Sequence, residues 1–445
     1  MIELPTEHDR RRELNDEAHA RPPEALVAPV RLSFFALFDD GTGGFDPRSS
    51  LVDLCNRFDV PPPPADVNHF SGDFGKFRLK WERHTEFTRY MAIVPGVEGE
   101  EPFSIAAVDA VPGDWLRGLT GKLIAAAHVA LVKGPANAID MEGVSGRWFG
   151  GNPMIGADIG DGAATALSDF RIHEDGFSRF VILDRTLAPR QAGRMVQRLL
   201  EIDTYRILAL MTLPVARELS PILNEVETEL VTLTTKLADS ATNDEPRLLE
   251  QITRLEARIQ QRNFKTAGRF GAAEAYHRLV QRRTRELREQ RIEGFQTFEE
   301  FIERRLSPAM ATCVAISARQ EKLAHRVAQT TQLLSTRVEV HRLAESQGVL
   351  QSMNRRALLQ LRLQQTVEGL SVAAITYYVV GLVSYVVKGL ASARTSFGAE
   401  LIVALSVPVV LGLVAIGVRR LRKMMQPIAQ QVASIGQKAK RHDID

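Results

Sequence analysis

The sequence LSVAAITYYVVGLVSYVV, residues Leu370–Val387, carries no charged side chain over 18 positions. Glu368 precedes this run and Lys388 follows it. As a helix, 18 residues span about 27 Å, close to the hydrocarbon thickness of a bilayer. Because the run has no polar face, a membrane-spanning helix explains it better than a buried helix of a soluble domain.

A second uncharged run of 18 residues, Leu401–Val418, follows after a short connection. We therefore predict two transmembrane helices, at 369–388 and 401–418, joined by a loop at 389–400. The alternative is a pair of helices packed inside a soluble domain. Basic residues stay on the cytoplasmic side of a membrane, and here they flank the two runs: Arg355, Arg356, Arg419 and Arg420. We expect both termini in the cytoplasm and a basic cytoplasmic tail at 419–445.

Charge is divided unevenly along the 445 residues, although the net charge is only +2. Residues 1–188 contain 29 acidic and 19 basic residues, a net charge of −10, whereas residues 189–445 have a net charge of +12. A basic membrane-proximal half suits a protein that stands on an anionic leaflet. The two cysteines, Cys55 and Cys313, have no metal-ligand spacing and fit a reducing compartment. The charged N-terminus leads us to expect no signal peptide.

The first part of the chain predicts an α/β (α+β) cytoplasmic domain at 29–188, behind an N-terminal arm at 1–28. Val30–Phe38 is a predicted strand, and Lys76–Tyr90 is the clearest one because apolar and charged residues alternate along it. Leu123–Val132 fits either a helix or a strand. Gly and Asp residues punctuate these segments, which favours a mixed or antiparallel sheet.

From Pro189 the apolar residues repeat with helical period, which predicts a helical stalk over 189–368. We place its helices at 189–211, 215–240, 246–266, 270–293 and from 298 onward. Leu323, Val327 and Leu334 follow coiled-coil spacing. Such a helix, unbroken from Pro308 to Lys388, would be on the order of 120 Å long and needs neighbours from its own chain or from identical subunits. We expect a homo-oligomer.

One candidate ligand site lies on the charged face of the predicted strand Lys76–Tyr90. Its members are Arg78, Lys80, Glu82, His84 and Glu86. The arm adds a second dense group of polar side chains: Asn15, Glu17, His19 and Arg21. The arm either folds back to complete a site with the strand or is pinned by these residues, and the strand face is otherwise an ordinary solvated surface. His84 with Glu82 and Glu86 could bind a cation, or Arg78 and Lys80 an anion. The metal and the cofactor stay unknown, because no other His, Cys or Asp cluster has metal spacing.

A second candidate surface lies within the first predicted transmembrane helix, 369–388. Five residues share one helical face there: Ala374, Tyr377, Gly381, Ser384 and Lys388. A small and polar face of this kind either lines a pore or allows close helix packing.

Two other functions have little support in the sequence. The glycine-rich stretch Gly150–Gly162 lacks GxGxxG and GxxxxGK[ST], so it gives no nucleotide site. Between Arg247 and Arg305 the arginines alternate with glutamates, which favours exposed helical faces, and no nucleic-acid partner is expected. An enzyme is not expected either, since a hydrolase would depend only on the clusters around His19 and His84.

Three stretches resemble a bacterial family of uncharacterised membrane-anchored proteins, domain of unknown function 3422. They are Leu14–Pro23, Gly75–Phe87 and Glu368–Tyr385. The resemblance covers essentially the whole chain and implies an inner-membrane location with the 389–400 loop in the periplasm, but no activity.

The layout is also similar to that of CorA-type metal-ion channels, which have an α/β head, long stalk helices and two C-terminal spans. Their Gly-Met-Asn motif is missing here, where the chain reads Lys388-Gly389-Leu390. The sequence thus predicts a homo-oligomeric inner-membrane protein of CorA-like build that passes ions or small solutes, with the head as sensor. The alternative is a non-transporting membrane-anchored scaffold or ligand-binding module.

Overall fold

The structure is a computed structural model of the 445-residue chain. It describes residues 5–420 except 13, 16–21, 42–43, 45, 135–140, 240–243 and 392–403. The chain divides into two compact units, Met1–Ser335 and Thr336–Asp445, and each is described by itself.

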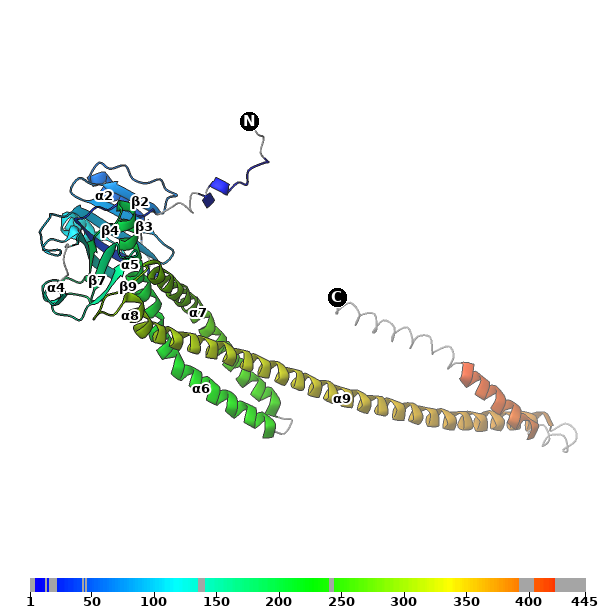
Figure 1. Ribbon diagram of the computed structural model, residues 1–445. Helices are drawn as coiled ribbons and strands as arrows, with labels where there is room; N and C mark the ends of the chain where they lie inside the picture. The colour runs from blue at the N-terminus through cyan, green and yellow to red at the C-terminus, as the bar shows by residue number, and fades with distance from the viewer. Residues whose placement is uncertain are drawn as a thin grey trace. The chain divides into compact units, whose positions relative to one another are not determined.

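A nine-stranded mixed sheet forms the centre of the first unit (Figure 1). Its spatial order is β2-β3-β4-β1-β5-β8-β7-β6-β9. The strands span Val30–Phe38 (β1), His69–Asp73 (β2), Arg78–Arg83 (β3), Phe87–Pro95 (β4), Lys122–Lys133 (β5), Ile155–Ile159 (β6), Ala164–Ser168 (β7), Ser178–Asp184 (β8) and Gln290–Arg291 (β9). The β5–β8 pair is parallel and the other pairs are antiparallel.

Helices occupy the connections and the second half of the chain. They span Pro47–Arg57 (α2), Gly113–Gly118 (α3), Met141–Trp148 (α4), Pro189–Leu210 (α5), Thr212–Asp239 (α6), Glu245–Glu286 (α7), Phe298–Arg305 (α8) and Ser307–Ala391 (α9), with a 3-10 turn at Ala107–Ala110 (η1). Proline begins α2 and α5, where its missing N–H costs no hydrogen bond.

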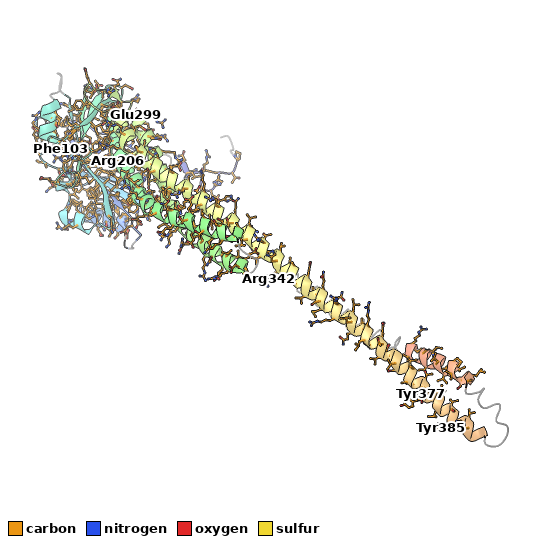
Figure 2. All side chains as sticks on the ribbon, turned by 90° about the horizontal axis from the view of Figure 1, so that it is seen from below. Phe103, Arg206, Glu299, Arg342, Tyr377 and Tyr385 are labelled. Atoms are coloured by element: carbon orange, nitrogen blue, oxygen red, sulfur yellow. The ribbon has the colours of Figure 1, made fainter. Side chains whose placement is uncertain are left out.

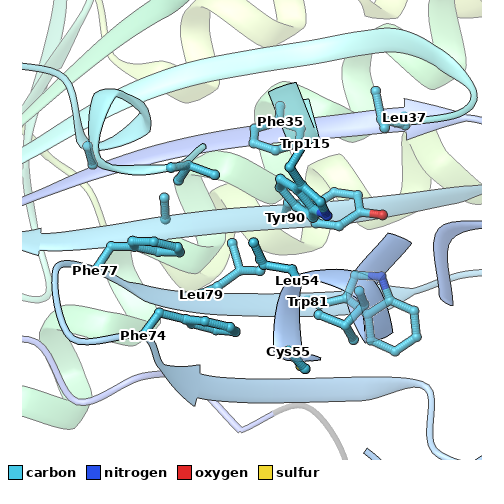
Figure 3. Packing of buried hydrophobic residues seen from close by; sticks show 14 of the residues in the cluster. Phe35, Leu37, Leu54, Cys55, Phe74, Phe77, Leu79, Trp81, Tyr90 and Trp115 are labelled. Atoms are coloured by element: carbon cyan, nitrogen blue, oxygen red, sulfur yellow. The ribbon is translucent and has the colours of Figure 1, made fainter. Parts of the chain in front are cut away.

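One face of the sheet carries an aromatic core, which Figure 3 shows. Phe77 and the β3 residues Leu79 and Trp81 point into it, because alternate residues of a strand face the same side. Leu54 of α2 and Trp115 of α3 cover them. The opposite face is covered by α5, so Lys80, between two of these inward positions, meets a helix rather than water, whereas Arg78 remains exposed.

Helices α6, α7 and the beginning of α9 pack together within the first unit. Leu323, Val327 and Leu334 of α9 are buried, so the apolar stripe predicted there is covered by helices of the same chain. Arg319 of α9 pairs with Glu227 of α6, and Thr266 of α7 donates to Gln320 of α9. The predicted break between 266 and 270 is wrong, since α7 is continuous through this region.

The predicted strand Lys76–Tyr90 is a hairpin instead of one strand. β3 ends at Arg83 and β4 begins at Phe87. The strands pair antiparallel, with Glu82 opposite Arg89. Charged and apolar residues alternate on both sides of the turn, which is why the sequence pattern resembled one continuous strand.

The predicted fold class, a head and coiled-coil stalk followed by two C-terminal transmembrane helices, is wrong. Among the described residues one helix is long and apolar enough to cross a membrane, and it lies within Phe298–Lys388. Residues 404–420 are also helical, but only 404–418 of them are uncharged, a length of about 22 Å that falls short of a bilayer core. Leu401–Val403 lie outside the described residues.

The second unit contains the rest of α9 and the 404–420 helix, which lie side by side (Figures 1 and 2). The apolar segment Leu370–Val387 is largely uncovered, since 6% of its most apolar 18-residue window is buried. Tyr377 and Tyr385, labelled in Figure 2, are 77% and 82% exposed. The described residues therefore leave most of this apolar segment without a cover.

Candidate functional site

Lys80 and Glu82 of the predicted charged strand are buried, with exposed fractions of 8% and 1%. They lie on the sheet face that α5 covers, and they line a small cavity together with Arg89 of β4 and Gly193 and Gln197 of α5. One alternative from the sequence was that this strand face is an ordinary solvated surface. Lys80 and Glu82 do not fit it, because they lie beneath α5.

His84 and Glu86 belong to the hairpin turn and do not join Lys80 and Glu82. The His84 ring stacks on Phe87 with centroids 4.4 Å apart. Glu86 accepts a hydrogen bond from the Tyr276 hydroxyl at 2.8 Å and pairs with Arg269 at 3.4 Å, which connects the turn to α7. The five residues predicted to share one face are therefore divided between two places.

The arm approaches the strand at its C-terminal end. Lys80 Nζ donates to the carbonyl oxygen of Pro22 at 2.7 Å, and Arg78 pairs with Glu24 at 3.0 Å. Asn15 lies in an exposed helical turn. Three further predicted members of this site, Glu17, His19 and Arg21, lie outside the described residues.

A buried ionic network joins the sheet to α5 and α7. Glu82 lies across the strands from Arg89 and pairs with it, and Lys80 Nζ is 3.0 Å from Glu82 Oε1. Arg89 also pairs with Glu201 of α5 at 3.3 Å, and Glu201 pairs with Arg283 of α7. These five residues, Lys80, Glu82, Arg89, Glu201 and Arg283, are called the ionic network below.

Glu82 and Arg89 of the ionic network stay ionised despite burial. Burial alone would raise the pKa of Glu82, but the charges of Arg89 and Lys80 hold that pKa below its ordinary value. Burial likewise opposes the charge of Arg89, yet Glu82 and Glu201 raise its pKa. The adjacent cavity measures about 20 Å³, enough for one water molecule. The network therefore holds elements together and has no room for a ligand.

Ser33, His128 and Asp175 form a second group of reactive residue types, in which Ser33 and His128 are buried and Asp175 is exposed. Ser33 Oγ lies 2.9 Å from His128 Nδ1, and His128 Nε2 lies 3.9 Å from Asp175. Burial lowers the pKa of His128 to about 4. However, Ser33 is fully buried between strands, and its Oγ accepts the Val108 N–H at 2.9 Å. No substrate reaches this hydroxyl, so the group does not form a nucleophilic site.

An open cleft of about 710 Å³ lies between α5 and the end of α7. Its lining consists of Arg194, Met195, Arg198, Arg282, Arg285, Glu286 and Arg288, and it is called the arginine cleft below. The arginines of α7 alternate with glutamates, a pattern that predicted exposed helical faces and no binding site. Arg194 and Arg198 lie almost 90 positions earlier, and only the packing of α5 against α7 brings the two sets together.

The arginine cleft is connected to the ionic network through Arg283. This side chain pairs with Glu201 and also, at 2.8 Å, with Glu286 in the cleft lining.

Among the described residues, no group of three or more His, Cys, Asp or Glu side chains is placed to hold a metal ion. In the apolar segment, Ala374, Tyr377 and Lys388 are exposed, and Gly381 and Ser384 are half-buried.

The sequence of the chain matches a known protein family. The chain belongs to the family described as "Protein of unknown function (DUF3422)". The match covers residues 6–425 and thus includes the sheet, the arginine cleft and the apolar segment. A search of curated proteins finds no match to the chain.

Proposed function

We propose that the protein is a membrane-anchored binding module, with the apolar segment of α9 in a bilayer and the Met1–Ser335 unit outside it. The observation that carries this proposal is the uncovered stretch Leu370–Val387, which has no charged residue and lies in a helix of sufficient length. Two charged residues, Glu368 and Lys388, mark the limits at which such a helix would meet the headgroups.

The energetics of transfer support this proposal. The apolar segment contains nine Leu, Val and Ile residues. Each contributes about 0.3–0.6 kcal/mol to insertion at a helix centre, so together they favour the bilayer by about 3–5 kcal/mol. In water the same side chains would remain exposed, and exposed apolar surface of this extent leads to aggregation.

Vesicle flotation of the full chain tests the anchor. We expect the wild-type protein to float with phospholipid vesicles and to resist extraction at high salt. Val379→Arg with Leu382→Arg places two charges in the middle of the segment at about 2.5–3.5 kcal/mol each, and this variant should leave the vesicle fraction. Gln360→Arg with Gln364→Arg adds the same two charges at exposed positions of the same helix before the segment, and this control should float like the wild type. A wild-type chain that stays in the supernatant without detergent contradicts the proposal.

We also propose that the module self-associates through the part of α9 that precedes the apolar segment. Large apolar side chains are exposed along it: Val340, Leu343, Val349, Leu350, Met353, Leu358, Leu359, Leu361, Leu363 and Val367. This stretch lies before Glu368 and therefore outside the proposed anchor. A second copy of the same helix offers an equally apolar partner, which supports a homo-oligomer.

Transport of an ion or small solute is the second candidate function. It is favoured by the face of Ala374, Tyr377 and Lys388, which is exposed and would be available to neighbouring copies. Liposome flux by the purified protein, compared with Gly381→Leu and Lys388→Glu, separates the two functions. A transporter would show a flux that these variants change, whereas an anchored module would show none in any of the three proteins.

A further inference from the structure

The arginine cleft concentrates positive charge that the described part of the chain does not neutralise. Its lining contains five arginines and one acid, Glu286. This carboxylate is shared, since Arg198 lies 3.3 Å from it, Arg282 lies 3.0 Å from it, and Arg283 of the ionic network lies 2.8 Å from it. One negative charge thus serves three guanidinium groups, and the remaining positive charge faces the cleft.

Two of the cleft arginines have no acidic partner in the part of the chain that the structure describes. Arg194 makes no hydrogen bond or ion pair with any described residue, and it is exposed. Arg285 donates only to the Gln281 carbonyl of its own helix, at 3.3 Å. Arg288 pairs with Asp161 from the β6–β7 turn at the edge of the cleft. Arg194 and Arg285 therefore have guanidinium N–H donors available for a ligand.

Helix stability does not explain this arrangement. Basic residues in the last turn of a helix interact favourably with its dipole, and this accounts for Arg283 and Arg285 of α7. Arg194 and Arg198, however, lie one turn apart on α5, where like charges at this spacing destabilise a helix. Their repulsion is relieved if an anion binds between the two helices.

We propose that the arginine cleft binds an anion that carries two or more adjacent phosphate groups. Guanidinium groups bind phosphate oxygens in pairs of parallel hydrogen bonds, and several of them converge here from two helices. The volume of about 710 Å³ lies within the range of small-molecule sites. The lining contains no aromatic side chain on which a base could stack, so recognition depends on the phosphates. This proposal goes beyond membrane attachment and does not depend on it.

Calorimetric titration of the full chain in neutral detergent tests the proposal. Inorganic triphosphate represents a soluble ligand, and inositol 1,4,5-trisphosphate represents a lipid headgroup. We expect saturable binding of at least one of them, weakened by added salt. The double variant Arg194→Gln, Arg285→Gln should lose at least about tenfold in affinity, because two charge-assisted contacts are removed. Both residues are exposed and form no ion pair, so the thermal unfolding midpoint should stay close to that of the wild type.

The matched control is Arg262→Gln with Lys265→Gln, which removes two exposed charges of α7 outside the cleft. This control should bind as the wild type does, and whichever probe binds more tightly identifies the source of the phosphates. The proposal is overturned if neither probe binds saturably, or if the cleft variant and the control lose affinity equally. Tighter binding of a single-stranded oligonucleotide than of both probes would overturn it as well, since the cleft would then be a nucleic-acid surface.

Discussion

Glu201 is the residue on which the ionic network depends most, because it pairs with arginines from two different elements. Arg89 comes from the sheet and Arg283 from α7, and the acid itself lies on α5. Both Glu201 and Arg89 are buried. A buried pair of this kind is worth little against an apolar replacement, but losing one partner leaves a charge without compensation.

Replacing Glu201 by Gln should therefore lower the free energy of unfolding by about 3–5 kcal/mol. Denaturant titration of the full chain in detergent measures this change. Glu250→Gln removes an exposed partner of Arg254 one helical turn away and should cost less than about 0.5 kcal/mol. Equal losses of unfolding free energy in the two variants would show that the ionic network stabilises the fold no more than an exposed ion pair does.

Glu289 makes the stability of the fold depend on pH. Burial raises the pKa of this carboxyl to about 7, although the N–H groups of Phe298 and Glu299 at the start of α8 oppose the shift. A folded-state pKa above the ordinary value means that the protonated form stabilises the fold. This contribution is complete below a pH of about 4.5 and is lost as pH rises through about 7.

Comparison with Glu289→Gln, which imitates the protonated acid, measures this effect. Between pH 5 and pH 8 the wild type should lose stability relative to the variant. An unchanged difference between the two proteins over this range would mean that Glu289 is ionised throughout and acts as an ordinary helix cap.

At the scale of elements, the N-terminal segment is held against α5 by a close backbone approach. A Cβ atom at Gly193 would lie 1.7 Å from the carbonyl oxygen of Glu24, which only a glycine permits. Leu26 N also donates to the carbonyl oxygen of Pro189 at 3.0 Å. The segment that contacts Lys80 and Arg78 is thus positioned by the first turns of α5.

Gly193→Ala should displace this segment and destabilise the protein by about 1–3 kcal/mol, as overpacking of an interior does. Limited proteolysis near Glu24 should become faster. Gly268→Ala, in the middle of α7 with nothing near its Cβ position, should instead stabilise by about 0.5–1 kcal/mol. Unchanged cleavage in Gly193→Ala would show that the segment is held by its side chains alone.

Much of the element order follows from sequence, and the errors have physical causes. The predicted strand Val30–Phe38 is confirmed, and the helix that begins at Pro189 is confirmed as well. The hairpin inside Lys76–Tyr90 was missed because its turn, His84–Glu86, contains neither Gly nor Pro. The sequence analysis ended one helix at 266 and began the next at 270, yet α7 continues through Gly268 and Gly271 because packing outweighs their low helix propensity.

The candidate sites were harder to predict than the elements. Burial of Lys80 and Glu82 depends on α5, more than 100 positions later in the chain, and no local pattern reports that contact. The arginine cleft was missed for the same reason, since its two sets of arginines are distant in sequence and meet only through the packing of α5 against α7. Local periodicity indicates which face is apolar, but it does not indicate which helix covers a charged face.

For the whole molecule, self-association is a separate prediction. Mass measurement in detergent should give a multiple of the 49.4 kDa chain. Leu350→Asp with Met353→Asp places two charges on one exposed face of α9 and should shift the protein toward the monomer. Gln351→Asp with Asn354→Asp adds the same charge beside that face and should leave the mass unchanged. A monomeric wild type at all concentrations would refute a homo-oligomer.

The proposed membrane anchor requires the apolar segment of α9 to lie in lipid. Cysteine labelling in reconstituted vesicles tests this directly, and both native cysteines, Cys55 and Cys313, are buried. A membrane-impermeant thiol reagent should label Gln360→Cys, an exposed position before the segment, in at least part of the population, but should label Val379→Cys only after detergent dissolves the vesicles. Equal labelling of both variants in intact vesicles would place the segment in water and contradict the membrane anchor.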